Sequence, residues 1–253
     1  MTLSMAIGPL IGLQILKETG SYQFLFITSG ILCSLAVLMS FFVNHPKISS
    51  RNNKLSWENV FEPKVLKVSM VMLLLAFLFA GIMSFITLFA KELSIESTGM
   101  FFLIYAIGVS IIRPTTGKMM DKKGPAFVML LSFIGTISGL VLLSQSTAEP
   151  GFLVAAFVLG LGNGIVMPTL QTMVINMVKP EKRGVATSTF FSSIDLGIGI
   201  GAFFLGNIVE IFSLSQMYLF CAIGMIVPAL LFFGITLSDY KKKSKISLET
   251  ANV

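Results

Sequence analysis

Charged side chains are scarce in this chain. Asp, Glu, Lys and Arg together make up 12% of its 253 residues, whereas hydrophobic residues make up 55%. That is about half the charge of a typical soluble domain. The chain has one histidine and two cysteines, Cys33 and Cys221, which lack the spacing of a metal or redox pair. These shortages exclude a soluble enzyme and predict a non-enzymatic protein without metal, cofactor or disulfide framework.

The hydrophobic residues gather in blocks long enough to cross a membrane as helices, which takes roughly 20 residues. The first block is short, at about 24 Å of helix. A secretory signal has a basic region before its apolar stretch, and this block has none. The pattern predicts an all-α polytopic membrane bundle of about eight transmembrane helices. The predicted spans are 1–16, 22–43, 68–90, 99–116, 125–145, 151–178, 184–209 and 214–237.

The basic residues fall on one side of these spans. Sixteen of the eighteen Lys and Arg residues lie in one set of alternate connections, and only Lys17 and Lys91 lie in the other. The positive-inside rule places the basic side in the cytoplasm. We therefore expect a multi-pass cell-membrane protein with a cytoplasmic C-terminus. Without a basic face interleaved with aromatics, the net charge of +6 predicts membrane topology and no nucleic-acid partner.

A faint internal repeat divides the chain. A shift of 194 residues aligns the first two predicted spans with the last two and pairs Gly12 with Gly206 and Ser21 with Ser215. Residues 68–237 are thus expected to form one six-helix half, and residues 1–43 the last two helices of another half. Residues 44–67 would be a cytoplasmic loop, with a short interfacial helix near Trp57, and residues 238–253 a cytoplasmic tail. This plan leaves four helices missing from the front, which a separate segment could supply.

The sequence RPTTGKMMDKKG follows the fourth predicted span, at residues 113–124. Gly117 and Gly124 would permit a tight turn, Asp121 could accept hydrogen bonds from a helix N-terminus, and Lys122 would anchor the turn at the membrane face. The segment resembles the cytoplasmic signature of the major facilitator superfamily. The resemblance implies a cytoplasmic gate. An ordinary basic turn is the alternative. Arg113 lies near the cytoplasmic end of its predicted span, where gating or a structural ion pair is favoured and substrate contact is the alternative.

The first predicted span carries Gly8, Pro9 and Gly12. Proline allows a bend, and the glycines would let helices approach closely. The segment resembles the fifth-helix signature of the family's antiporter branch, although Ser4 and Leu13 replace expected glycines. This likeness favours export over import. The alternative is a generic packing face of small residues.

Asp195 is the one acidic residue placed deep in a predicted span. Its Asp-Leu-Gly segment resembles the eleventh helix of many efflux permeases. A carboxylate in hydrocarbon is costly and often functional, so Asp195 is a candidate for proton coupling or substrate contact. A structural pairing with another helix is the alternative.

The sixth predicted span combines a glycine cluster with Asn163 and Gln171. These two side chains could share a helix face and line a cavity, or they could make hydrogen bonds between helices. The glycines lack the preceding strand that a nucleotide-binding fingerprint requires.

The family resemblance implies a secondary transporter that works by alternating access. We expect proton-coupled efflux of small amphipathic molecules, with the lipid bilayer, a small-molecule substrate and protons as partners. Uptake or metabolite exchange on the same fold is an alternative. Another is a fragment that is inactive alone.

Overall fold

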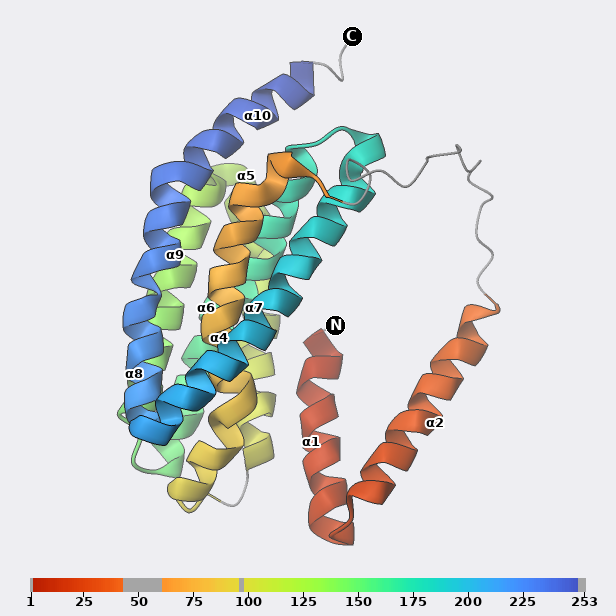
Figure 1. Ribbon diagram of the computed structural model, residues 1–253, viewed down its shortest axis with the longest axis vertical. Coiled ribbons are helices and arrows are strands. Elements are labelled where there is room, and N and C mark those ends of the chain that lie inside the picture. Colours follow the sequence, from red (N-terminus) through yellow and green to blue (C-terminus); the bar gives the residue numbers. More distant parts are fainter. Residues whose placement is uncertain (1, 43–60, 96–97, 250–253) are drawn as a thin grey trace.

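The computed structural model describes residues 2–42, 61–95 and 98–249, which contain helices and no strand (Figure 1). The predicted all-α architecture is confirmed. The predicted interfacial helix around Trp57 lies outside these residues. The helices are α1 (Thr2–Thr19), α2 (Tyr22–Ser40), 3-10 helix η1 (Pro63–Val65), α4 (Leu66–Glu92), α5 (Thr98–Ser144), α6 (Glu149–Asn176), 3-10 helix η2 (Pro180–Lys182), α7 (Arg183–Ile211), α8 (Leu214–Gly224), α9 (Ile226–Leu231), π-helix η3 (Phe232–Thr236) and α10 (Leu237–Glu249).

Six helical segments of the described chain are long and apolar enough to cross a membrane. They are α2, η1 with α4, α5, α6, η2 with α7, and the run from Leu214 to Lys243. α5 has 47 residues, about 70 Å of helix against a hydrocarbon core of roughly 30 Å, so it contains two of the predicted spans. α1 is not among the six, because Gln14, Lys17 and Glu18 interrupt its apolar residues.

The two halves of α5 meet at Gly124. This residue has φ 75° and ψ 170°, which is outside the helical region, and Pro125 then occupies the first position of the second half, where proline is favoured. The turn predicted at Gly124 is therefore present. The prediction for Gly117 was wrong, because Gly117 lies inside the helix and the first half continues beyond residue 116 to Lys123. The charged segment is an extension of the membrane helix.

Helix α6 lies against both halves of α5 through glycines on different faces. A Cβ atom on Gly160 would collide with the carbonyl group of Tyr105, and one on Gly162 would lie 2.5 Å from the backbone nitrogen of Thr136. Ser132 Oγ donates a 2.8 Å hydrogen bond to the carbonyl oxygen of Gly162 across the second contact. The glycine cluster of the sixth predicted span is thus a packing surface for two neighbouring helices.

A second close pair is formed by α4 and α7. Cβ atoms on Gly197 and Gly201 would collide with the carbonyl oxygens of Leu73 and Phe77. This contact fixes the rotation of α7 about its own axis. One face of α7 is held against α4, and the face with Asp195 is turned away from it.

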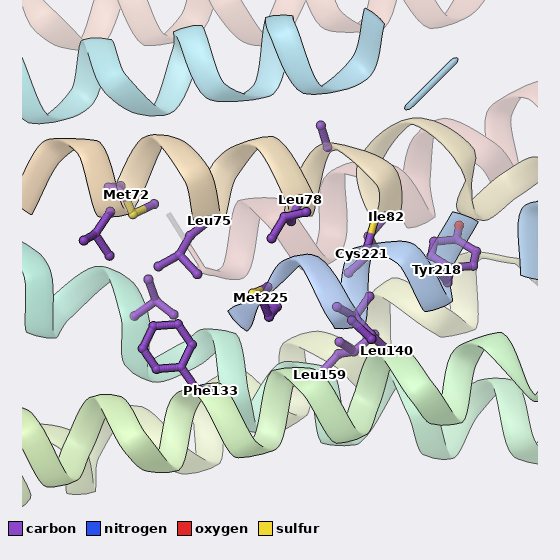
Figure 2. Packing of buried hydrophobic residues seen from close by; sticks show 14 of the residues in the cluster. Met72, Leu75, Leu78, Ile82, Phe133, Leu140, Leu159, Tyr218, Cys221 and Met225 are labelled. Atoms are coloured by element: carbon purple, nitrogen blue, oxygen red, sulfur yellow. The ribbon is translucent and has the colours of Figure 1, made fainter. Parts of the chain in front are cut away.

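The apolar core lies between α4, α8 and the α5–α6 pair (Figure 2). Tyr218 and Cys221 of α8 are buried between α4 on one side and the α5–α6 pair on the other. Near one end of the bundle, aromatic rings close the core: Phe89 lies 5.2 Å from Tyr218 and Phe101 lies 4.8 Å from Phe152 between ring centroids. The core side chains drawn in Figure 2 include Met72, Leu75, Leu78, Ile82, Phe133, Leu140, Leu159 and Met225.

Helices α1 and α2 form a hairpin beside this bundle (Figure 1). Gly20 makes the turn with φ 62°, and Ser21 caps α2 by accepting a hydrogen bond from the backbone N–H of Gln23 at 3.2 Å. α1 packs against α5. No residue of α2 is buried, although most of its residues are apolar.

Candidate functional site

Asp195 lies on an exposed strip of α7. Ser188, Ser192, Asp195 and Gly199 are all exposed and follow one another at spacings of four, three and four residues, which places them on one helix face. Asp195 makes no hydrogen bond or ion pair with any residue that the structure describes. The structural pairing considered for Asp195 therefore finds no partner in the described part of the chain.

A cavity of about 1010 Å³ opens beside this strip, at the end of the bundle that carries η1 and η2. Its walls come from residues 61–73, from the connection between α6 and α7, and from α7. The apolar side chains include those of Leu66, Met70, Leu73 and Leu196. The charged side chains are those of Lys64, Lys179, Lys182 and Glu62.

Glu62 is fixed against the backbone at the edge of this cavity. Its side chain is 6% exposed, and its Oε1 accepts a 3.3 Å hydrogen bond from the backbone N–H of Lys64, which caps η1. The backbone N–H of Glu62 donates to Thr189 Oγ1 at 3.1 Å. These bonds tie residues 62–64 to α7 and use part of the acceptor capacity of the carboxylate.

Ser69 supplies a polar group without a partner. Ser69 is 2% exposed and lines the cavity, yet its Oγ makes no hydrogen bond with the described residues. Burying a hydroxyl without a hydrogen bond costs about 1–3 kcal/mol. Such a group in a cavity wall is available to a ligand.

Asn163 and Gln171 lie elsewhere. Neither is among the residues that line this cavity. The Asn163 side chain lies beside the Tyr105 hydroxyl of α5, and its buried Nδ2 has no acceptor at full hydrogen-bond geometry in the described chain. Gln171 is half-buried two turns further along α6. The position of Asn163 between two helices favours a role in contacts between helices over a role in lining a cavity.

The family signature is at the same end of the bundle as the cavity. Arg113, Gly117, Asp121 and Lys122 are exposed, and Arg113 interacts electrostatically with Tyr105. Asp121 makes no hydrogen bond or ion pair with the described residues. The helix N-terminus expected to contact Asp121 is therefore not found among them.

The small residues of the first predicted span do not produce a close helix contact in the described chain. Gly8 has open space around it, and a Cβ on Gly12 would meet Leu25 of α2 at 3.7 Å, an ordinary van der Waals distance. α1 continues as a helix through Pro9. The expectation that Gly8 and Gly12 bring helices unusually close was wrong for the helices described.

An ion-pair cluster joins the C-terminal helix to the start of α4, and sequence analysis missed it. Asp239 Oδ1 lies 3.1 Å from Lys67 Nζ, and Asp239 Oδ2 lies 2.7 Å from Lys243 Nζ. Lys243 Nζ also donates to the carbonyl oxygen of Lys64 at 2.9 Å. The spacing of Asp239 and Lys243 could have indicated their pairing, but nothing local in the sequence indicates Lys67. Within the described ranges, no group of His, Cys, Asp and Glu residues could hold a metal ion.

Comparison with known proteins agrees with this architecture. Residues 68–252 match the Major Facilitator Superfamily. An uncharacterised MFS-type transporter of Methanocaldococcus jannaschii is 26% identical over 91% of this chain and 62% of its own length. The staphylopine export protein of Staphylococcus aureus is 24% identical over 92% of this chain and 62% of its own length.

A third relative, the multidrug resistance protein MdtG of Proteus mirabilis, is 25% identical over 68% of this chain and 45% of its own length. The chain thus spans about three fifths of the length of the first two curated relatives. The family match extends over nearly the whole bundle from α4 to α10 and coincides with helices able to cross a membrane. This chain is a multi-pass membrane protein that belongs to the Major Facilitator Superfamily.

Proposed function

We propose that this chain takes part in proton-coupled export of small amphipathic molecules by alternating access, with Asp195 as the group that exchanges protons. The observation that carries the proposal is the exposed position of Asp195 in the middle of α7, without a partner among the described residues. A carboxylate at membrane depth is costly, and such groups commonly mark substrate or proton pathways. No described residue gives Asp195 a structural pairing that would offset this cost.

The surroundings of Asp195 support a transport role. Ser188 and Ser192 on the same face are polar but small, so water or a substrate can approach the carboxylate along α7. The cavity beside this face is mostly apolar with a few polar groups, as is usual for sites that bind small molecules. Two relatives with names that specify export or drug resistance favour outward transport.

The proposed membrane orientation follows from the charges. The connections near η1, Gly124 and η2 and the start of α10 lie at one end of the bundle (Figure 1), and this end carries most of the basic residues. We place it in the cytoplasm of a cell-membrane protein. We propose that residues 68–237 form a six-helix half with a cytoplasmic tail, and that the predicted cytoplasmic loop ends before η1, because η1 and the start of α4 occupy residues 63–67.

The exposed faces of α7 and α2 also suggest what completes the transporter. Secondary transporters of this class place their substrate site between two six-helix halves. We propose that α1, α2 and a further four-helix segment, in the same or a separate polypeptide, form the second half and cover the Asp195 face. Without that segment, residues 1–253 are expected to be inactive in transport.

The test compares wild type with D195N and D195E in proteoliposomes, with and without a co-reconstituted four-helix segment taken from the N-terminal part of the M. jannaschii relative. Transport of labelled amphipathic amines and acids is followed under an imposed pH gradient. E210Q removes the other acidic residue of α7, which lies at the C-terminal end of the helix, and serves as the matched control.

Wild type and E210Q should respond to the gradient only when the segment is present. D195N should lose this response but retain exchange of labelled for unlabelled substrate, and D195E should regain part of it. A D195N protein that still follows the pH gradient would remove Asp195 from the mechanism. Movement of substrate and protons in the same direction would replace export by the uptake alternative.

A further inference from the structure

The cavity beside α7 combines apolar walls with a concentration of positive charge. Three lysines, Lys64, Lys179 and Lys182, come from both sides of it, and the one acidic residue in its lining, Glu62, is held against the backbone of η1. The lining therefore carries more positive than negative charge, which favours an anionic ligand.

The backbone adds to this positive charge. α4 begins at Leu66 and α7 begins at Arg183, so both helices have their N-termini at the end of the bundle where the cavity lies. Helix N-termini carry partial positive charge. The 3-10 turns η1 and η2 lead directly into these helices, and Glu62 and Glu181 at the two turns offset part of this charge.

The interior of the cavity is suited to the apolar part of a ligand. Leu66, Met70 and Leu73 of α4 face it from one side and Leu196 of α7 from the other. Ser69 adds one buried hydroxyl without a partner in the described chain. A ligand with an apolar body and a single acceptor near its head would fit both features.

We propose that this cavity binds an amphipathic anion, with its phosphate or carboxylate head near Lys64 and Lys179 and its apolar body between α4 and α7, and that Ser69 donates a hydrogen bond to an oxygen atom of the head. The assignment of this ligand as a transport substrate rests on the proposed function. The binding itself does not, because it is measured without a pH gradient and without transport.

Binding of dodecyl phosphate and of dodecyltrimethylammonium to the full chain in phosphatidylcholine nanodiscs tests the proposal. The variant K64Q/K179Q removes two lysines of the cavity and leaves the Lys64 carbonyl that Lys243 contacts. K241Q/K242Q is the matched control, since it removes two exposed lysines of α10 that do not line the cavity.

Wild type should bind dodecyl phosphate with about tenfold higher affinity than K64Q/K179Q, as expected for the loss of charge-assisted contacts. The control should differ from wild type by less than about twofold. S69A should lower the affinity for dodecyl phosphate by roughly fivefold. Equal binding of the ammonium compound and the phosphate by wild type, or equal losses in the two double variants, would overturn the proposal.

The same chemistry could come from a membrane lipid or from a free amphiphile, and a second measurement separates these sources. Native mass spectrometry of the chain taken from phosphatidylglycerol nanodiscs counts the lipids that remain bound. One more retained lipid in wild type than in K64Q/K179Q identifies a lipid headgroup as an occupant. Equal retention, together with tight dodecyl phosphate binding, identifies a free amphiphile.

Discussion

Lys67 Nζ lies 3.1 Å from Oδ1 of Asp239, which joins the first turn of α4 to the first turn of α10 across 172 residues of sequence. The same carboxylate contacts Lys243 one helical turn further along α10. Thr236 Oγ1 donates to the Lys67 carbonyl oxygen at 3.4 Å beside this contact. The C-terminal helix is therefore attached to the bundle by polar contacts at the end where the cavity opens.

The substitution D239N should loosen this attachment. Lys67 is 48% exposed, so solvent screens the pair and the expected loss of stability is about 1 kcal/mol or less. The substitution should weaken the attachment of α10 more than it lowers the stability of the whole bundle. Limited proteolysis should cut the tail beyond Leu237 faster in D239N than in wild type, and high salt should reduce the difference.

The control for this prediction is E210Q, which removes an exposed carboxylate without an ion pair in the described chain. Its tail should be cut at the wild-type rate. Identical rates for D239N and wild type at low salt would show that the ion pairs do not hold α10.

The two glycines of the family signature should respond oppositely to alanine. Gly124 adopts φ 75° and ψ 170°, a conformation that costs a residue with a side chain about 1–3 kcal/mol. Gly117 lies inside the helix with open space around it, and alanine is favoured there by roughly 0.5–1 kcal/mol. Thermal unfolding in detergent should therefore show a lower midpoint for G124A and an equal or higher midpoint for G117A. If the two variants shift the midpoint in the same direction, the turn is not at Gly124.

Membrane sidedness can be measured with single cysteines in a C33A/C221A background. K122C lies on the charged extension of α5, K241C on α10, and K91C near the other end of α4. A membrane-impermeant maleimide should label K91C on intact cells, and K122C and K241C only after permeabilisation. Labelling of K122C and K241C from opposite sides would contradict the topology and, with it, the transporter architecture.

The sequence was most informative about the positions of the helices. Long apolar blocks mark spans because few alternatives satisfy the backbone in a membrane, and the six helical segments able to span fall on the predicted blocks. The boundary after residue 116 was wrong, because a helix can continue past the membrane into charged residues such as Lys118 and Lys122. Hydropathy marks the edge of the hydrocarbon and does not mark the end of a helix.

The sequence was least informative about contacts between distant segments. Gly160 and Gly162 belong to the glycine cluster seen in the sequence, but their role as packing residues depends on which helices lie beside them. The cavity and the pairing of Lys67 with Asp239 likewise join segments more than a hundred residues apart. Asp195 could be named as a candidate because a single acidic residue in an apolar block is conspicuous without knowledge of its neighbours.

The glycine contacts have a mechanical consequence. α5 with α6, and α4 with α7, touch backbone to backbone, so neither pair can separate without creating voids. The plane of easiest sliding then runs between the two pairs, where the described glycines make no such close contact, as in shear motions of packed helices. Because α4 and α7 form the walls of the cavity and the α6–α7 connection forms part of its rim, such sliding would widen or narrow the entrance while the walls keep their spacing.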